Sequence, residues 1–186
     1  MALILASASP RRRDFLKQMG ISFRVCPARG EEKIQPGWHP EEVASHLAKQ
    51  KAWEVAARHP KDTVIGADTI VVLGSEVLGK PKDKEQAAHM LSMLSGKTHQ
   101  VMTGVWVILG GNEYGFVQKT DVTFYPLTGL DIKRYVDTGE PMDKAGAYGI
   151  QGLGMALVEG IQGDYTNVVG LPVARLLRLL RELGQL

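Results

Sequence analysis

The stretch VIGADTIVVL, residues 64–73, places a single carboxylate inside an apolar run. Its run of Val, Ile and Leu is typical of a buried β-strand. Asp68 lies in the middle of this run, and an ionised carboxylate is costly to bury unless cations or hydrogen-bond donors accompany it. Gly66 and Ala67 leave room for another group to approach the backbone. The alternative is a structural role, in which Asp68 caps a turn at the end of the strand.

Length and composition are those of an ordinary globular protein. The 186 residues can form a sizeable core, and 44% of them are hydrophobic. The net charge of +2 gives no general affinity for polyanions, so an anion site has to be local. The single cysteine, Cys26, excludes an internal disulfide. The apolar N-terminus is too short for a signal peptide or a membrane span, and we expect a cytoplasmic protein.

Apolar patterns predict further elements on both sides of this strand. Strands are expected near residues 3–6, 23–26, 76–78, 100–109, 113–124 and 155–158, and helices near residues 10–19, 40–58, 83–94, 128–136 and 172–183. Ser9 and Pro10 form a typical helix start, in which the serine side chain caps the first turn. The short strand 76–78 is expected to return on residues 64–73 as a hairpin.

The helix expected after Pro10 begins with Arg11, Arg12 and Arg13. Cations in a first turn oppose the helix macrodipole, at a cost of about 0.3–1 kcal/mol each. Guanidinium groups beside free backbone N–H groups form an anion site, most simply for phosphate. The alternative is that these arginines are good helix formers on a solvated face.

A glycine-rich segment follows in the second half of the chain. Four glycines fall within residues 146–154. Such density allows close backbone approach and suits a loop that encloses a ligand. Tyr148, Ile150 and Leu153 make this segment too apolar for a flexible linker.

Signatures of several other classes of protein are incomplete. The segment 95–98, Ser-Gly-Lys-Thr, lacks the earlier glycine of a P-loop, because position 91 is a leucine. The glycines at 149, 152 and 154 do not match a dinucleotide-binding fingerprint. The five histidines form no close pair of zinc ligands, and no Gly-x-Ser-x-Gly elbow is present.

What remains is a set of cations and carboxylates in the first half of the chain: Arg11, Arg12, Lys51, Lys80, Glu31, Glu32 and Asp68. Lysine and arginine can hold a polyphosphate, and carboxylates hold hard cations such as Mg²⁺. A carboxylate can also orient or deprotonate a water that attacks phosphorus. These residues together predict a phosphoryl- or nucleotidyl-group hydrolase.

Five blocks of the sequence resemble the Maf family. They are ASASPRR (6–12), GADT (66–69), GKP (79–81), DKAGAYGIQG (143–152) and VGLP (169–172). The resemblance covers nearly the whole chain and implies one Maf-like domain over residues 1–186. The implied fold is α/β and Maf/ITPase-like, an elongated mixed β-sheet flanked by helices with two lobes around a deep cleft. The implied activity is hydrolysis of nucleoside triphosphates to monophosphate and pyrophosphate with a divalent cation, Mg²⁺ or Mn²⁺, as control of the nucleotide pool.

The same resemblance implies roles for particular residues. Asp68 matches the catalytic carboxylate and proton acceptor, and Ser7, Arg12, Lys51 and Lys80 match phosphate-handling positions. Lys80 is also expected to act in catalysis. The acidic loop position falls on Glu31 or Glu32; we favour Glu32 as a catalytic residue that holds the metal together with Asp68.

Three positions indicate which substrates are preferred. Arg11, Thr69 and Gln151 resemble the dTTP/UTP pyrophosphatase type, whereas the 7-methyl-GTP type carries an aromatic residue after the proline and an acid in the glycine loop. A neutral Gln151 offers a donor and an acceptor to a pyrimidine edge. Thr69 follows Asp68 in the strand, so their side chains are expected on opposite sides.

A second class of function remains open, a non-catalytic nucleotide- or nucleic-acid-binding regulator of cell division. Asp68, Lys51 and Lys80 favour the enzyme, because a protein that only binds has less need of a buried carboxylate beside phosphates. We therefore expect a nucleoside triphosphate as the ligand, with no stable nucleic-acid partner and no membrane. The resemblance also suggests a homodimer.

Overall fold

The computed structural model describes residues 1–35 and 37–186. Its strands are β1 (Leu3–Leu5), β2 (Arg24–Val25), β3 (Thr63–Leu73), β4 (Glu76–Leu78), β5 (Thr98–Leu109), β6 (Asn112–Phe124) and β7 (Val158–Gln162). Its helices are α1 (Pro10–Gln18), α2 (Pro40–Ala56), α3 (Lys84–Leu94), α4 (Gly129–Asp137), α5 (Tyr165–Val169) and α6 (Val173–Glu182), with three short 3-10 helices, η1 (Glu140–Asp143), η2 (Ala145–Ala147) and η3 (Gly152–Leu157). Among the described residues, no helix is both long enough and apolar enough to cross a membrane.

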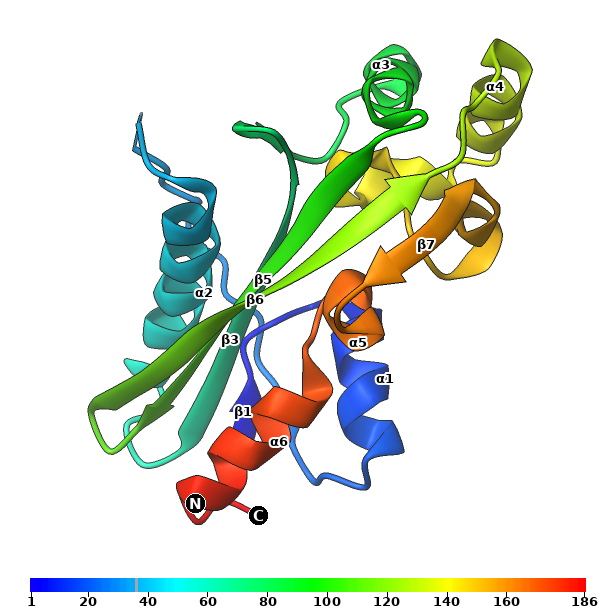
Figure 1. The fold of residues 1–186 in the computed structure, drawn as a ribbon. Helices are drawn as coiled ribbons and strands as arrows, with labels where there is room; N and C mark the ends of the chain where they lie inside the picture. The colour runs from blue at the N-terminus through cyan, green and yellow to red at the C-terminus, as the bar shows by residue number, and fades with distance from the viewer. Residues whose placement is uncertain (36) are drawn as a thin grey trace. The chain divides into compact units, whose positions relative to one another are not determined.

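In this part of the chain the strands form one mixed sheet of seven, in the order β2-β1-β3-β5-β6-β7, with β4 paired to β3 (Figure 1). β1 runs parallel to β2 and to β3, whereas β4 is antiparallel to β3 and β7 is antiparallel to β6. A mixed sheet flanked by helices confirms the predicted α/β class. The deep cleft between two lobes stays a prediction.

Contacts divide the chain into two compact units. The first comprises Met1–Thr69, Thr103–Gln118 and Gly170–Leu186, and the second comprises Ile70–Met102 and Lys119–Val169. The single domain over residues 1–186 stays a prediction.

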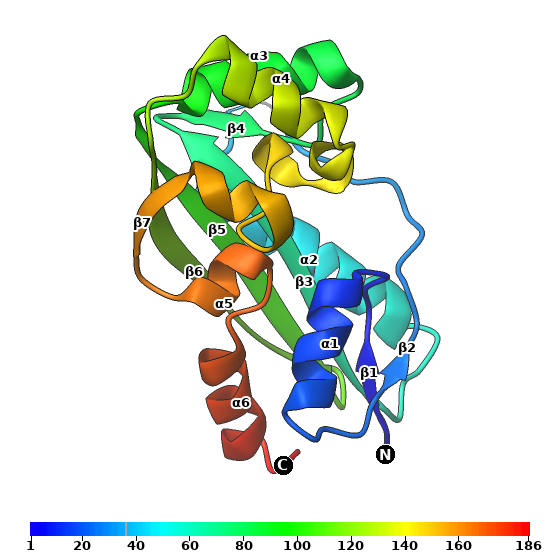
Figure 2. The ribbon, with the colours of Figure 1, turned by 90° about the vertical axis from the view of Figure 1, so that its right-hand side faces the viewer.

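Apolar side chains in the first unit alternate between the two faces of β1 and β3. Ile4 and Val64 pack with residues of α2 on one face, and Leu5 and Ile65 pack with residues of α1 and α6 on the other. Figure 2 shows α1 and α2 on opposite sides of these strands. Because α1 joins β1 to β2 and α2 joins β2 to β3, the two helices cover opposite faces and the winding reverses at β1. The carboxyl end of the strand at such a reversal is where α/β proteins bind ligands.

Small residues bring α2 unusually close to the sheet. A Cβ atom on Gly66 of β3 would lie 2.4 Å from the carbonyl oxygen of Ala48 and 2.7 Å from the Cβ of Ala52. No larger side chain fits between the helix and the strand at this point. The contact fixes the height of α2 above β3, and with it the position of Lys51, one residue before Ala52.

The second unit has its own apolar core, formed by α3, α4, η2 and the adjoining strand residues, and α3 and α4 lie side by side (Figure 2). His99 is buried in this core, with its Nε2 atom 2.8 Å from the hydroxyl oxygen of Tyr148. Burial lowers the pKa of His99 to about 4, so its ring is neutral near pH 7. Its role is packing, in edge-on contact with Phe124 and Tyr148.

Two predictions of local structure are wrong. A buried strand is expected at residues 155–158, but residues 155–157 belong to η3 and Met155 is 61% exposed. The chain turns at Gly152 with φ of +68°, so the extended segment starts only at Val158. Ser9 does precede α1, but its side chain makes no capping hydrogen bond. Its backbone N–H donates to Ser7 Oγ instead (3.2 Å), and Pro10 supplies the helix start.

Candidate functional site

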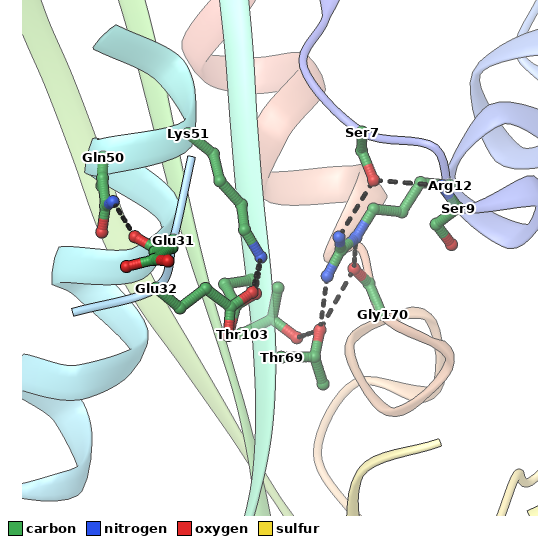
Figure 3. A network of polar contacts seen from close by, with 11 residues as sticks. Ser7, Ser9, Arg12, Glu31, Glu32, Gln50, Lys51, Thr69, Thr103 and Gly170 are labelled. Carbon is green, nitrogen blue, oxygen red and sulfur yellow. Dashed lines mark hydrogen bonds and ion pairs between the residues drawn. The ribbon is translucent and has the colours of Figure 1, made fainter. Parts of the chain in front are cut away.

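Arg12 forms the centre of a buried polar cluster in the first unit. Its Nε atom donates to the carbonyl oxygen of Gly170 (2.8 Å), its Nη1 to Ser7 Oγ (3.2 Å) and its Nη2 to Thr69 Oγ1 (3.0 Å) (Figure 3). Ser7 lies just after β1, Arg12 in the first turn of α1, and Thr69 on β3. The cluster therefore forms at the carboxyl end of β1, where the winding reverses.

Thr103 of β5 completes the support of the arginine. It is fully buried, and its Oγ1 atom lies 2.9 Å from that of Thr69. Since Thr69 accepts a hydrogen bond from Arg12, its own proton is directed to Thr103 or to the Gly170 carbonyl oxygen, 3.4 Å away. The guanidinium is thus held on three sides by neutral oxygen atoms.

The electrostatics of Arg12 favour an anionic partner. Burial lowers the pKa of the Arg12 guanidinium, and the charge of Asp68 acts in the opposite direction. Among the described residues, no carboxylate lies within ion-pair distance of Arg12, and its three hydrogen bonds leave one N–H on each terminal nitrogen. Two N–H groups on neighbouring nitrogens match the oxygens of a phosphate.

The hydroxyl of Ser7 is also placed to bind an anion. Its oxygen accepts hydrogen bonds from Arg12 Nη1 and from the backbone N–H of Ser9. Both bonds use its lone pairs, so the Ser7 O–H proton is available to an acceptor such as a phosphate oxygen.

Lys51 of α2 forms the centre of a second cluster in the first unit. Its ammonium group lies 2.8 Å from Glu32 Oε1 and makes a close ion pair with Asp68 Oδ1. The side chain of Asp68 is 12% exposed, that of Lys51 is 22% exposed and that of Glu32 is 53% exposed. Asp68 contacts α2 and Thr69 contacts α1, so neighbouring residues of β3 point to opposite faces, as expected.

A loop anchored along α2 brings Glu32 to this position. The carboxylate of Glu54 accepts hydrogen bonds from the backbone N–H groups of Arg29 (2.8 Å) and Gly30 (2.9 Å). These two donors lower the pKa of Glu54. Gln50 Nε2 donates to the backbone carbonyl oxygen of Glu31 (2.6 Å). Glu32, the next residue, is the one of the two glutamates whose side chain meets Lys51 (Figure 3).

The carboxylates of Glu32 and Asp68 suit a divalent cation. Both already converge on one cationic nitrogen, and carboxylate oxygens are the ligands that Mg²⁺ and Mn²⁺ prefer. Within the described residues no group of three or more His, Cys, Asp or Glu side chains is arranged as a metal site. A cation held by these two carboxylates alone would have further positions for water or phosphate oxygens.

The other predicted residues lie in different places. Arg11 is half-buried in the first turn of α1 and has polar contacts of its own. Lys80 and Gln151 are exposed and belong to the second unit. Lys80 follows Gly79, whose carbonyl oxygen accepts the N–H of Gly146 (3.0 Å).

Two members of the Arg12 cluster have no role in the sequence predictions. Thr103 could have been found as a polar residue inside the apolar run 101–109. Gly170 belongs to the VGLP block, but it contacts Arg12 through its backbone carbonyl oxygen. Every residue type has this group, so the sequence does not predict the contact.

A family model described as Maf-like protein matches residues 2–183. The chain belongs to the Maf family. Among its relatives are proteins named dTTP/UTP pyrophosphatase from Agathobacter rectalis, 52% identical over 98% of this chain and 97% of the relative, and from Koribacter versatilis, 52% identical over 100% and 96%. A protein of the same name from Bacillus pumilus is 50% identical over 98% of this chain and 96% of its own length.

Proposed function

We propose that this protein is a nucleoside triphosphate pyrophosphatase that hydrolyses dTTP and UTP to the monophosphate and pyrophosphate. Membership of the Maf family and the name shared by its relatives support the activity. The observation that carries the proposal for this chain is the position of two adjacent residues of β3. Thr69 binds the phosphate-ready Arg12, and Asp68 pairs with Lys51, which also contacts Glu32.

In the proposed reaction Arg12 and Ser7 bind phosphate oxygens with the N–H and O–H groups left over from their mutual contacts. Asp68 orients a water and accepts its proton as the water oxygen bonds to the α-phosphorus. The bond from that phosphorus to the bridging oxygen breaks, and pyrophosphate leaves. Lys51 and Lys80 offset negative charge on the phosphates, and Lys80 is assigned by motif alone.

We further propose that Asp68 and Glu32 hold Mg²⁺ or Mn²⁺. When bound, the cation offsets phosphate charge and polarises the phosphoryl oxygens. The ammonium group of Lys51 forms ion pairs with both carboxylates. The space between the two carboxylates therefore favours a positive charge.

The preference for pyrimidines rests on Arg11, Thr69 and Gln151. Thr69 acts through Arg12 in this proposal, because its hydroxyl is occupied by Arg12 and Thr103. Gln151 reads the base edge by offering both a donor and an acceptor.

Two parts of the proposal concern the protein in the cell. A cytoplasmic location fits the nucleoside triphosphate substrates of the proposed activity, and a homodimer is proposed from the family resemblance. Light scattering of the purified protein measures the second directly.

The test of the activity is pyrophosphate release from dTTP, UTP, CTP, GTP and 7-methyl-GTP with Mg²⁺ or Mn²⁺. Faster release from dTTP and UTP than from the other three is the expected result. Tight nucleotide binding without release of pyrophosphate by any of them would instead favour the regulator that binds without turnover.

A further inference from the structure

The glycine loop around Gln151 is tied at both ends to two side chains that no motif assigns a role. Glu140 Oε1 accepts the backbone N–H of Gly154 (3.0 Å), and Glu140 Oε2 accepts that of Leu153 (3.0 Å). On the other side of Gln151, the N–H of Gly149 donates to the hydroxyl oxygen of Tyr135 (3.2 Å). Three backbone donors of the loop therefore end on these two residues.

Glu140 and Tyr135 are also joined to each other. The Tyr135 hydroxyl donates to Glu140 Oε1 (3.0 Å), so the two residues form one continuous support beneath the loop. Tyr135 is buried on α4, and Glu140 begins η1 three residues after that helix ends. Lys144 Nζ donates to the backbone carbonyl oxygen of Glu140 (2.6 Å) and fixes the main chain at this point.

The loop lies directly against this support. A Cβ atom on Gly152, whose φ is +68°, would come within 2.7 Å of Glu140 Oε2. The backbone of the loop thus packs on the carboxylate with no space for a side chain. Gln151, immediately before Gly152, stays exposed while its neighbours on both sides are held.

The charge states support these contacts. Burial by itself would raise the pKa of Glu140, but the N–H groups of Leu153 and Gly154 and the Tyr135 hydroxyl outweigh it, and the pKa is lowered. Burial raises the pKa of Tyr135, so its hydroxyl keeps its proton and donates it to Glu140. An ionised acceptor and a protonated donor are the states that these hydrogen bonds require.

On the basis of the proposed function, we propose that Glu140 and Tyr135 are positioning residues that hold the Gln151 loop in one conformation and so set the discrimination between nucleobases. A glycine-rich segment without such support samples many conformations. On a mobile backbone, the Gln151 amide could form hydrogen bonds with every base, so the bases would be discriminated poorly. The support converts a flexible segment into a defined hydrogen-bonding edge.

The experiment compares Glu140→Gln and Tyr135→Phe with Gln151→Ala and with a control, Glu159→Gln. Glu140→Gln replaces an acceptor oxygen by an NH₂ donor, and Tyr135→Phe removes the acceptor of the Gly149 N–H. Glu159 is an exposed residue of β7, so its change is chemically matched but outside the loop. The kcat/KM of each variant is measured for UTP, dTTP, CTP and GTP, and backbone hydrogen exchange is measured at residues 149–154.

We expect both positioning variants to lower the UTP-to-GTP ratio of kcat/KM by about 3- to 10-fold, in the same direction as Gln151→Ala. Amide exchange at 153 and 154 should accelerate in Glu140→Gln, and exchange at 149 should accelerate in Tyr135→Phe. Adding Glu140→Gln to Gln151→Ala should change the ratio no further, because both act through one side chain. Glu159→Gln should match the wild type in every measurement.

The outcomes separate this inference from the proposed function. An equal loss for all four nucleotides, or faster exchange with an unchanged ratio, would give Glu140 a structural role only and overturn the inference while the pyrophosphatase stands. Absence of pyrophosphate release by the wild type would count against the proposed function itself. Should Glu140→Gln fail to fold, Tyr135→Phe carries the same comparison with a single hydroxyl removed.

Discussion

Two cationic side chains of the first unit, Arg12 and Lys51, have opposite surroundings. Arg12 is bound by neutral oxygen atoms of Ser7, Thr69 and Gly170, so its cluster keeps a full positive charge. Lys51 forms ion pairs with two carboxylates, so its cluster has a formal charge of −1.

The difference indicates what each cluster can bind. A buried cation without an ionic partner is stabilised by an incoming anion, and the lowered pKa of Arg12 reflects that need. A lysine outnumbered by carboxylates leaves an excess of negative charge that attracts a further cation. Under the proposed function, the positive Arg12 cluster would therefore bind phosphate and the negative Lys51 cluster would bind a metal ion.

The largest expected effect is that of Asp68→Asn, which removes the charge but keeps the size of the side chain. We predict a loss of kcat of at least ~10²-fold, the lower range for a general base, with the fold retained. The exposed Asp14 of α1 provides the control Asp14→Asn. Near-normal turnover by folded Asp68→Asn protein would remove the carboxylate from the mechanism.

The second effect is on phosphate binding by Arg12. Arg12→Ala should weaken triphosphate binding by about 10- to 100-fold, the value of a charge-assisted hydrogen bond, and Arg12→Lys should recover only part of it because the fork of N–H groups is lost. Titration calorimetry with a non-hydrolysable analogue measures both, with Arg178→Ala on the exposed face of α6 as control. Full recovery of triphosphate binding by Arg12→Lys would mean that only the positive charge matters at this position.

The third prediction separates two adjacent glutamates. Glu32→Gln should raise the Mn²⁺ concentration for half-maximal activity by at least about 10-fold, since a direct ligand matters no less than an outer-sphere one. Glu31→Gln is the matched control, because Glu31 contacts Gln50 through its backbone carbonyl. Calorimetry with Mn²⁺ and no nucleotide gives a second readout. Equal responses of the two variants would contradict the assignment of Glu32.

The smallest effect is expected at Thr103, which supports Arg12 through Thr69. Thr103→Val keeps the shape and removes the hydrogen bond with Thr69, so it should cost about 1 kcal/mol of unfolding free energy and raise KM a few-fold. The pair Thr98–Thr123, with its hydroxyl oxygens 2.8 Å apart, provides Thr98→Val as an exposed control. Urea unfolding and steady-state kinetics measure the two quantities. A loss of stability with unchanged KM would make Thr103 a packing residue.

The sequence predicts elements that carry a strong local pattern. The strands expected in the apolar runs of β3 and β5 and the helix expected near residues 128–136, which is α4, are confirmed, since each signal lies within one element. The expected strand at 155–158 was wrong, because the chain just before it turns at Gly152 and the N–H groups of Leu153 and Gly154 bind Glu140, about 14 residues away. Local periodicity contains no information on such a partner.

The same limit applies to the candidate site. Unusual charge placement identifies Arg12 and Asp68, because cations in a first turn and a carboxylate in an apolar run are costly without a purpose. The carbonyl of Gly170 lies 158 residues from Arg12 along the chain and is contributed by the backbone. The choice between Glu31 and Glu32 needs the loop anchors at Gln50 and Glu54, which only the fold brings together.

The alternation of Asp68 and Thr69 on β3 constrains how this protein can change through evolution. One peptide bond separates the side chain facing Lys51 from the side chain facing Arg12. Insertion or deletion of one residue earlier in the strand would exchange the two faces and place a hydroxyl where the carboxylate is needed. Length variation is therefore excluded from this strand, while the turn at residues 110–111 is free to accept it.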